Sequence, residues 1–168
     1  MSLLQDLPLD ELTPARLWTM LDSPTRVLAA RAMFTGDRQK RDQANHAIAV
    51  ALRFRDAGVR KLSLDRRVDY LSRVVRADHA LASSLLMALH LDCRQGLLVS
   101  FLDELKIPHH DGLIAEDYEV GPVAAGTLKP AVAKLREHFD EAEVEVYVAS
   151  LLALDPEVWG GLAEFLRE

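Results

Sequence analysis

Residues 80–91 have the sequence ALASSLLMALHL, and residues 144–154 have the sequence VEVYVASLLAL. Both segments are long enough for a helix, and apolar side chains would occupy almost every side of that helix. A helix that lacks a polar face is stable only where neighbouring elements cover it. The two segments therefore predict two buried helices, each packed among amphipathic ones.

Helical patterns recur through the rest of the chain, whereas the alternation of β-branched and polar residues that marks strands is nearly absent. Asp65, Asp78, Asp92 and Thr127 are placed to cap helices, and Gly58 is placed to end one. The predicted helices cover residues 10–21, 23–34, 42–57, 64–76, 80–91, 94–106, 129–139, 141–154 and 156–168. We therefore predict an all-α fold of eight or nine helices.

The predicted helix over residues 64–76 has a clear apolar face. With helical spacing, that face comprises Leu64, Val68, Leu71, Val74 and Val75. The opposite face comprises Arg66, Asp69, Arg73 and Arg76. This pattern predicts a helix with one buried side and one solvated, basic side.

A short internal sequence similarity suggests how the helices are arranged. GLLVSFLDE at residues 96–104 aligns with GGLAEFLRE at 160–168, at an offset of 64 residues. Units of about 40 residues with two or three helices are typical of HEAT and armadillo repeats. We predict solenoid-like stacking of two related three-helix units, at about 65–106 and 129–168. A compact orthogonal bundle is the alternative fold. Generic helix patterning explains the internal similarity equally well.

The chain length and composition predict a single globular domain. The 168 residues are 49% hydrophobic and 27% charged, with a net charge of −6. The expected organisation within residues 1–168 is a set of N-terminal helices (1–106), a long loop (107–128) and a C-terminal three-helix unit (129–168). The lone Cys93 excludes a disulfide framework within the chain, and no signal peptide or membrane-length apolar run is evident. A cytoplasmic protein without a membrane partner is expected.

Charge is distributed unevenly along the sequence. Residues 26–76 include 13 Lys and Arg and 5 Asp and Glu. Residues 103–168 include 5 Lys and Arg and 15 Asp and Glu. The segment 53–76 could contact a nucleic-acid backbone, although only Phe54 and Tyr70 interleave with its basic residues. The acidic total argues against nucleic acid, and a solvated face is the simpler interpretation.

The long irregular segment 107–126 is the place where function is expected, because connections in helical domains are usually much shorter. It begins within KIPHHDGLI at residues 106–114. His109, His110 and Asp111 are candidate metal ligands, together with loop carboxylates. The simpler interpretation is that Pro108 ends a helix and Asp111-Gly112 turns the chain. No cofactor is predicted.

Other chemical motifs are weak. His90-x-x-Cys93 has the spacing of a zinc-ligand pair, but a helix would separate it from His109 by roughly 20 Å. Nothing around Cys93 resembles a nucleophile motif, and the phosphate-binding loops and Glu-x-x-His pairs of known site classes are absent from the sequence. The sequence therefore favours a protein that is not an enzyme.

Recognition of another protein is the function that we predict. Stacked helices commonly serve as binding platforms, and aromatic and arginine side chains dominate the energetics of interfaces. Trp18 and Trp159 are expected in the core. The predicted partner-binding residues are Tyr118, Glu116, Asp117, Glu119, Arg66, Arg73 and Arg76. The alternatives are a small-molecule or metal-dependent activity at 107–126, and backbone binding of nucleic acid through 53–76. A homo-oligomer is also left open.

Overall fold

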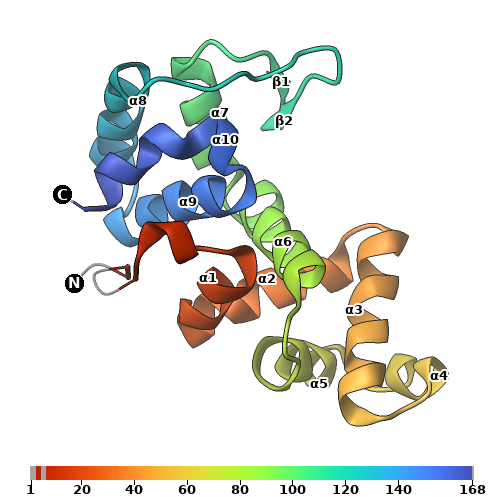
Figure 1. The fold of residues 1–168 in the computed structure, drawn as a ribbon. Helices are drawn as coiled ribbons and strands as arrows, with labels where there is room; N and C mark the ends of the chain where they lie inside the picture. The colour runs from red at the N-terminus through yellow and green to blue at the C-terminus, as the bar shows by residue number, and fades with distance from the viewer. Residues whose placement is uncertain (1–2, 5–6, 168) are drawn as a thin grey trace. The chain divides into compact units, whose positions relative to one another are not determined.

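The computed structural model describes residues 3–4 and 7–167, and it is all-helical apart from one small hairpin (Figure 1). The predicted fold class is thus confirmed. The chain divides into two compact units. The first, here called the acidic unit, combines Met1–Leu17 with Arg94–Glu168, and the second, the basic unit, is Trp18–Cys93. The names reflect 7 Lys and Arg against 18 Asp and Glu in the acidic unit, and 13 against 8 in the basic unit.

Helix α2 is the central element of the basic unit, and it packs against α3, α5 and α6. The largest fully buried side chains of this unit include Met33, Ile48, Leu71, Leu85 and Leu86. Side chains of Asp22, Asp37 and Asp78 accept hydrogen bonds from backbone N–H groups and so cap three helices. The helices are α2 (Ser23–Thr35), α3 (Arg38–Leu52), α4 (Asp56–Arg60), α5 (Leu64–Asp69) and α6 (His79–Ala88).

Two helices of the basic unit end in π-helical turns, η2 (Tyr70–Val74) and η3 (Leu89–Cys93). In η2, the backbone N–H of Val75 donates to the carbonyl of Tyr70, 2.9 Å away. Such a turn holds more residues than an α-turn and rotates the following side chains around the axis. Val74 is consequently 48% exposed, so its predicted place on the buried face was wrong, whereas Leu71 and Val75 are buried.

Helix α9 (Glu141–Leu154) is the most buried helix of the acidic unit, and it packs against α8, α10 and η4. It confirms one of the two predicted buried helices, whereas α6 is buried along one face and leaves Met87 48% exposed. Asp140 caps α9 by accepting from the N–H groups of Ala142 and Glu143. The other elements are η1 (Leu9–Glu11), α1 (Pro14–Met20, which continues into the basic unit), α7 (Gln95–Glu104), β1 (His109–His110), β2 (Leu113–Ile114), α8 (Ala125–His138), α10 (Pro156–Trp159) and η4 (Gly160–Leu166).

An aromatic cluster occupies the core of the acidic unit. The ring of Phe101 meets that of Tyr147 edge to face, with centroids 5.4 Å apart, and lies 5.7 Å from the ring of Trp159. Phe101 is fully buried, and burial raises the pKa of the Tyr147 phenol far above its usual value. Trp18 and Trp159 are both buried, as predicted.

Three of the predicted N-caps were wrong. Helix α5 is capped by Ser63, whose hydroxyl accepts from the N–H of Arg66, while Asp65 lies in the first turn, where a negative charge favours the helix dipole. Helices α7 and α8 begin without any side-chain cap. Asp92 instead accepts a hydrogen bond from Lys40 at 3.2 Å, and Thr127 lies inside α8.

The predicted end of the third helix was also wrong. Helix α3 ends at Leu52 because Arg53 adopts the left-handed conformation, with φ of 55°. Gly58, the predicted terminator, lies inside the short helix α4. A non-glycine residue in this conformation is uncommon, so sequence alone gave no reason to end the helix there.

The two segments that are similar in sequence form different kinds of helix. Residues 96–104 lie in the α-helix α7, whereas 160–166 form the 3₁₀-helix η4. Solenoid-like stacking of the two three-helix units stays a prediction. Within the described residues, no single helix is both long and apolar enough to cross a membrane; His79–Cys93 and Gln95–Glu104 reach those limits only as a sharply bent pair.

Candidate functional site: an exposed hairpin of the acidic unit

The irregular segment after α7 folds into a tight hairpin. Strands β1 and β2 pair antiparallel, with His110 opposite Leu113, so only Asp111 and Gly112 form the loop. Both have positive φ, 50° and 91°, as the type I′ turn preferred in two-residue hairpins requires. Figure 1 shows this hairpin followed by an extended segment that runs back to α8. The predicted turn at Asp111-Gly112 is confirmed.

The imidazole of His109 holds the hairpin to α7. Its Nδ1 accepts from the backbone N–H of Gly112 at 3.1 Å, so the ring proton lies on Nε2, which donates to Asp103 at 2.8 Å. The side chain of His109 is only 11% exposed. A second tie is the amide of Gln95, which donates to the carbonyl of Asp111 at 2.8 Å. These bonds fix the hairpin in one position on the acidic unit.

The structure does not gather the candidate metal ligands around one point. Both ring nitrogens of His109 are already hydrogen-bonded, whereas His110 is 93% exposed and has Asp111 at 3.6 Å. Within residues 3–4 and 7–167, no group of three or more His, Cys, Asp or Glu side chains could hold a metal ion. His90 is buried and Cys93 is exposed, although both belong to η3.

Three apolar side chains of this segment are exposed to solvent. Leu113 is 56% exposed, Ile114 is 37% exposed and Tyr118 is 42% exposed. Leu113 and Ile114 form the whole of β2, and the N–H of Tyr118 donates to the carbonyl of Ala115 at 3.0 Å. We call Leu113, Ile114, Glu116, Asp117, Tyr118 and Glu119 the hairpin surface. Leu113 and Ile114 are consecutive strand residues, so they expose apolar area on opposite faces of the hairpin, which makes this segment a candidate for binding.

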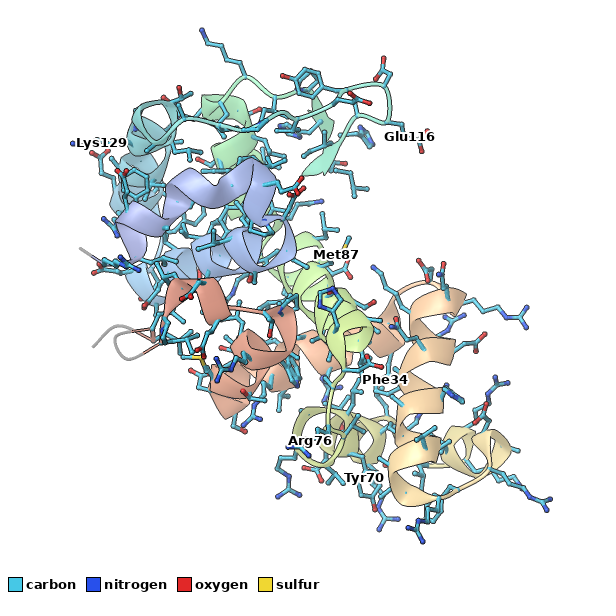
Figure 2. The ribbon with its side chains drawn as sticks, in the orientation of Figure 1. Phe34, Tyr70, Arg76, Met87, Glu116 and Lys129 are labelled. Atoms are coloured by element: carbon cyan, nitrogen blue, oxygen red, sulfur yellow. The ribbon has the colours of Figure 1, made fainter. Side chains whose placement is uncertain are left out.

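Carboxylates flank these apolar groups. Glu116, Asp117 and Glu119 are exposed, and no described basic side chain lies within ion-pairing distance of any of them. Figure 2 shows Glu116 at the outer end of the segment, pointing away from the helices. The hairpin surface therefore combines apolar area with uncompensated negative charge.

The predicted partner-binding residues divide between the two units. The four from the loop belong to the hairpin surface, whereas Arg66, Arg73 and Arg76 belong to the basic unit. Arg73 donates to Asp69 at 2.8 Å, and this hydrogen bond raises the pKa of its guanidinium. Arg66 and Arg76 are exposed. These arginines are therefore considered apart from the hairpin surface.

Leu113 and Ile114 were missed as candidate binding residues. The Asp-Gly dipeptide that precedes them indicates a two-residue turn, and such a turn places them in the second strand of a short hairpin. That step would have identified their position, although not their exposure. The amino-acid sequence matches no known protein-family model, no curated protein and no solved structure. Function must therefore be inferred from exposure, charge and hydrogen bonding.

Replacing Gly112 with alanine is expected to loosen the hairpin. A Cβ atom at φ of 91° is strained, at a cost of about 1–2 kcal/mol. Hydrogen exchange of the Ala115 N–H, which donates to the carbonyl of Pro108 at 3.0 Å, should accelerate about tenfold. The control is Gly121→Ala in the same segment, where an added Cβ meets nothing within 4 Å. Equal acceleration in both variants would contradict the assigned turn.

Proposed function

We propose that the protein is a non-enzymatic interaction module that binds another protein through the hairpin surface. The observation that carries the proposal is the combination of a fixed hairpin, three exposed apolar side chains and three unpaired carboxylates. The partner that fits this chemistry presents apolar side chains together with lysine or arginine. The sequence supports a non-enzymatic role, since it contains no recognisable catalytic motif.

Hydrogen bonding of the hairpin lowers the entropic cost of binding. When a loop becomes ordered only on binding, the conformational entropy that its side chains and backbone lose weakens the binding free energy. The bonds of His109 and Gln95 hold the hairpin in place before the partner arrives. Tyr118 is the strongest candidate anchor, because tyrosine adds large contact area with few rotatable bonds.

The carboxylates supply specificity rather than most of the affinity. Exposed charges at the rim of an interface accelerate encounter with an oppositely charged partner and repel a like-charged one. Their effect is screened over roughly 8 Å at physiological ionic strength. Binding through the hairpin surface should therefore weaken as salt is added. The single exposed thiol of Cys93 fits a reducing compartment, and we propose the cytoplasm as the location.

Site-specific photo-crosslinking in living cells tests the proposal. A photoreactive residue at Leu113 or Tyr118 should capture a discrete protein, whereas the same residue at Glu137, exposed on α8, should not. Capture should be lost when Glu116→Lys, Asp117→Lys and Glu119→Lys are combined. It should persist in the charge-matched control Glu137→Lys, Glu157→Lys and Glu164→Lys, which alters three exposed carboxylates of the same unit. Equal capture at all three positions would overturn the proposal.

A further inference from the structure

A second exposed surface lies where α3 meets α4 in the basic unit. Val50 is 65% exposed and Phe54 is 51% exposed, the largest values among the exposed large apolar side chains of this unit. Arg53 lies between them, and its left-handed conformation ends α3. The N–H of Phe54 then donates to the carbonyl of Ala49 at 2.9 Å, which fixes the backbone at Phe54.

Three cations accompany these apolar groups. Arg53, Arg55 and Lys61 are exposed, and no described carboxylate lies within ion-pairing distance of them. We call Val50, Arg53, Phe54, Arg55 and Lys61 the α3–α4 corner. Among the neighbouring charges, Arg60 donates to Asp42 at 3.2 Å, and Asp56 lies 3.8 Å from His46, which is a cation only when protonated. The corner therefore carries an excess of positive charge beside exposed apolar area.

The hairpin surface and the α3–α4 corner match in chemistry. One presents three apolar side chains with three unpaired carboxylates, and the other presents two apolar side chains with three unpaired cations. Each surface supplies what the other lacks, and both stand on backbone that is fixed by hydrogen bonds. Complementary electrostatic potentials on two surfaces favour the correct partner and orient it.

We propose that the hairpin surface of one molecule docks onto the α3–α4 corner of a second copy of the same chain. This inference rests on the proposed function and names its partner. The contact joins two different surfaces, so it is heterologous, and a pair keeps one free surface of each kind, the corner on one molecule and the hairpin surface on the other. Association should therefore continue beyond a dimer as concentration rises, unless the geometry closes a ring.

The expected self-association is weak and sensitive to salt. Small, charged surfaces form transient complexes, and a dissociation constant in the micromolar range or weaker is typical of them. Raising the ionic strength to about 1 M shortens the screening length to roughly 3 Å. Wild-type protein should therefore associate at low salt and become monomeric at high salt.

Sedimentation equilibrium of two charge-reversed variants tests the pairing. The hairpin variant combines Glu116→Lys, Asp117→Lys and Glu119→Lys, and the corner variant combines Arg53→Glu and Arg55→Glu. Each variant alone brings like charges together, so its self-association should be at least about tenfold weaker than that of wild type. Mixing the two restores opposite charges at both kinds of contact, and association should return to within a few-fold of wild type.

Matched controls separate this docking from a general effect of charge. Arg38→Glu with Arg41→Glu changes the charge of the basic unit as much as the corner variant does, at exposed residues outside the corner. Glu137→Lys, Glu157→Lys and Glu164→Lys does the same for the hairpin variant. Both controls should associate like wild type. Weakening as strong as that of the test variants, or failure of the mixture to associate, would overturn the inference.

Failure of the inference differs visibly from failure of the proposed function. A wild-type protein that stays monomeric at about 0.3 mM and low salt excludes a second copy as partner. If the hairpin surface still captures a different protein in cells, the proposed function stands and only the partner named here is wrong. Binding of fluorescent single-stranded RNA that is lost with Arg53→Glu and Arg55→Glu, without self-association, would assign the corner to nucleic acid and overturn the inference.

Discussion

Replacing Phe101 with alanine is expected to lower the free energy of unfolding by about 3–5 kcal/mol. The ring is fully buried on α7, with Tyr147 edge to face at 5.4 Å and Trp159 at 5.7 Å. Alanine forfeits the transfer free energy of the ring, leaves a cavity and removes both aromatic contacts, each worth about 0.5–1.5 kcal/mol beyond area burial. Large rigid neighbours such as these cannot collapse into the space.

Urea unfolding, monitored by tryptophan fluorescence, measures this loss as a fall in the denaturation midpoint. Phe54→Ala is the matched control, because it removes the same ring from a side chain that is 51% exposed. Its effect should stay within about 0.5 kcal/mol. A comparable loss in both variants would mean that Phe101 is not packed in the aromatic cluster described above.

The second large effect is expected at Leu85 in the basic unit. Its side chain is fully buried on α6, the helix that packs against α2. Leu85→Ala should lower the free energy of unfolding by about 2–5 kcal/mol, with the exact value set by how far the surrounding side chains relax. Each kcal/mol corresponds to a fall in Tm of about 2–4 °C for a chain of this size.

Met87 provides the control on the same helix. It is 48% exposed, and Figure 2 shows it on α6. Met87→Ala makes a similar truncation at a helical position, where alanine is also the better helix former. Calorimetry should show a Tm near that of wild type for Met87→Ala and a much lower Tm for Leu85→Ala. The opposite order would mean that the buried face of α6 is assigned wrongly.

The features that sequence predicted well are those set by local chemistry or by burial pattern. Of the four predicted caps only Asp78 is confirmed, because its side-chain oxygen reaches the N–H of Leu81 in the first turn of α6. Helix α9 is buried on nearly every side because it has no polar face beyond its first turns, whereas α6 is buried along one face and exposes Met87. Both inferences need only a few neighbouring residues, so a single sequence suffices for them.

The features that it missed depend on irregular backbone geometry. A π-turn after α5 rotates the side chains that follow, so helical spacing taken across residue 70 assigned Val74 to the wrong face. Arg53 ends α3 in a conformation that glycine usually adopts, and the nearest glycine in the sequence drew the prediction five residues too far. Whether a helix contains a π-turn or ends at a left-handed residue depends on three-dimensional packing, and the local sequence pattern does not show this.

The candidate site was predicted in part. Its position in the segment 107–126 and its turn at Asp111-Gly112 came from segment length and turn chemistry. The hydrogen bonds of His109 could not be predicted, since they depend on how the hairpin returns to α7. The α3–α4 corner was partly visible in RFR at residues 53–55, but the exposure of Val50 follows only from where α3 ends.

The division of charge between the two units affects how the protein is handled in the laboratory. Ion-exchange resins respond to the charge of the surface that faces them, more than to the sum over the whole molecule. A chain with a net charge of −6, whose basic unit holds 13 Lys and Arg against 8 Asp and Glu, should adhere to cation and anion exchangers alike at low ionic strength. An isoelectric point near 5.5 is therefore a poor guide to the column on which this protein purifies.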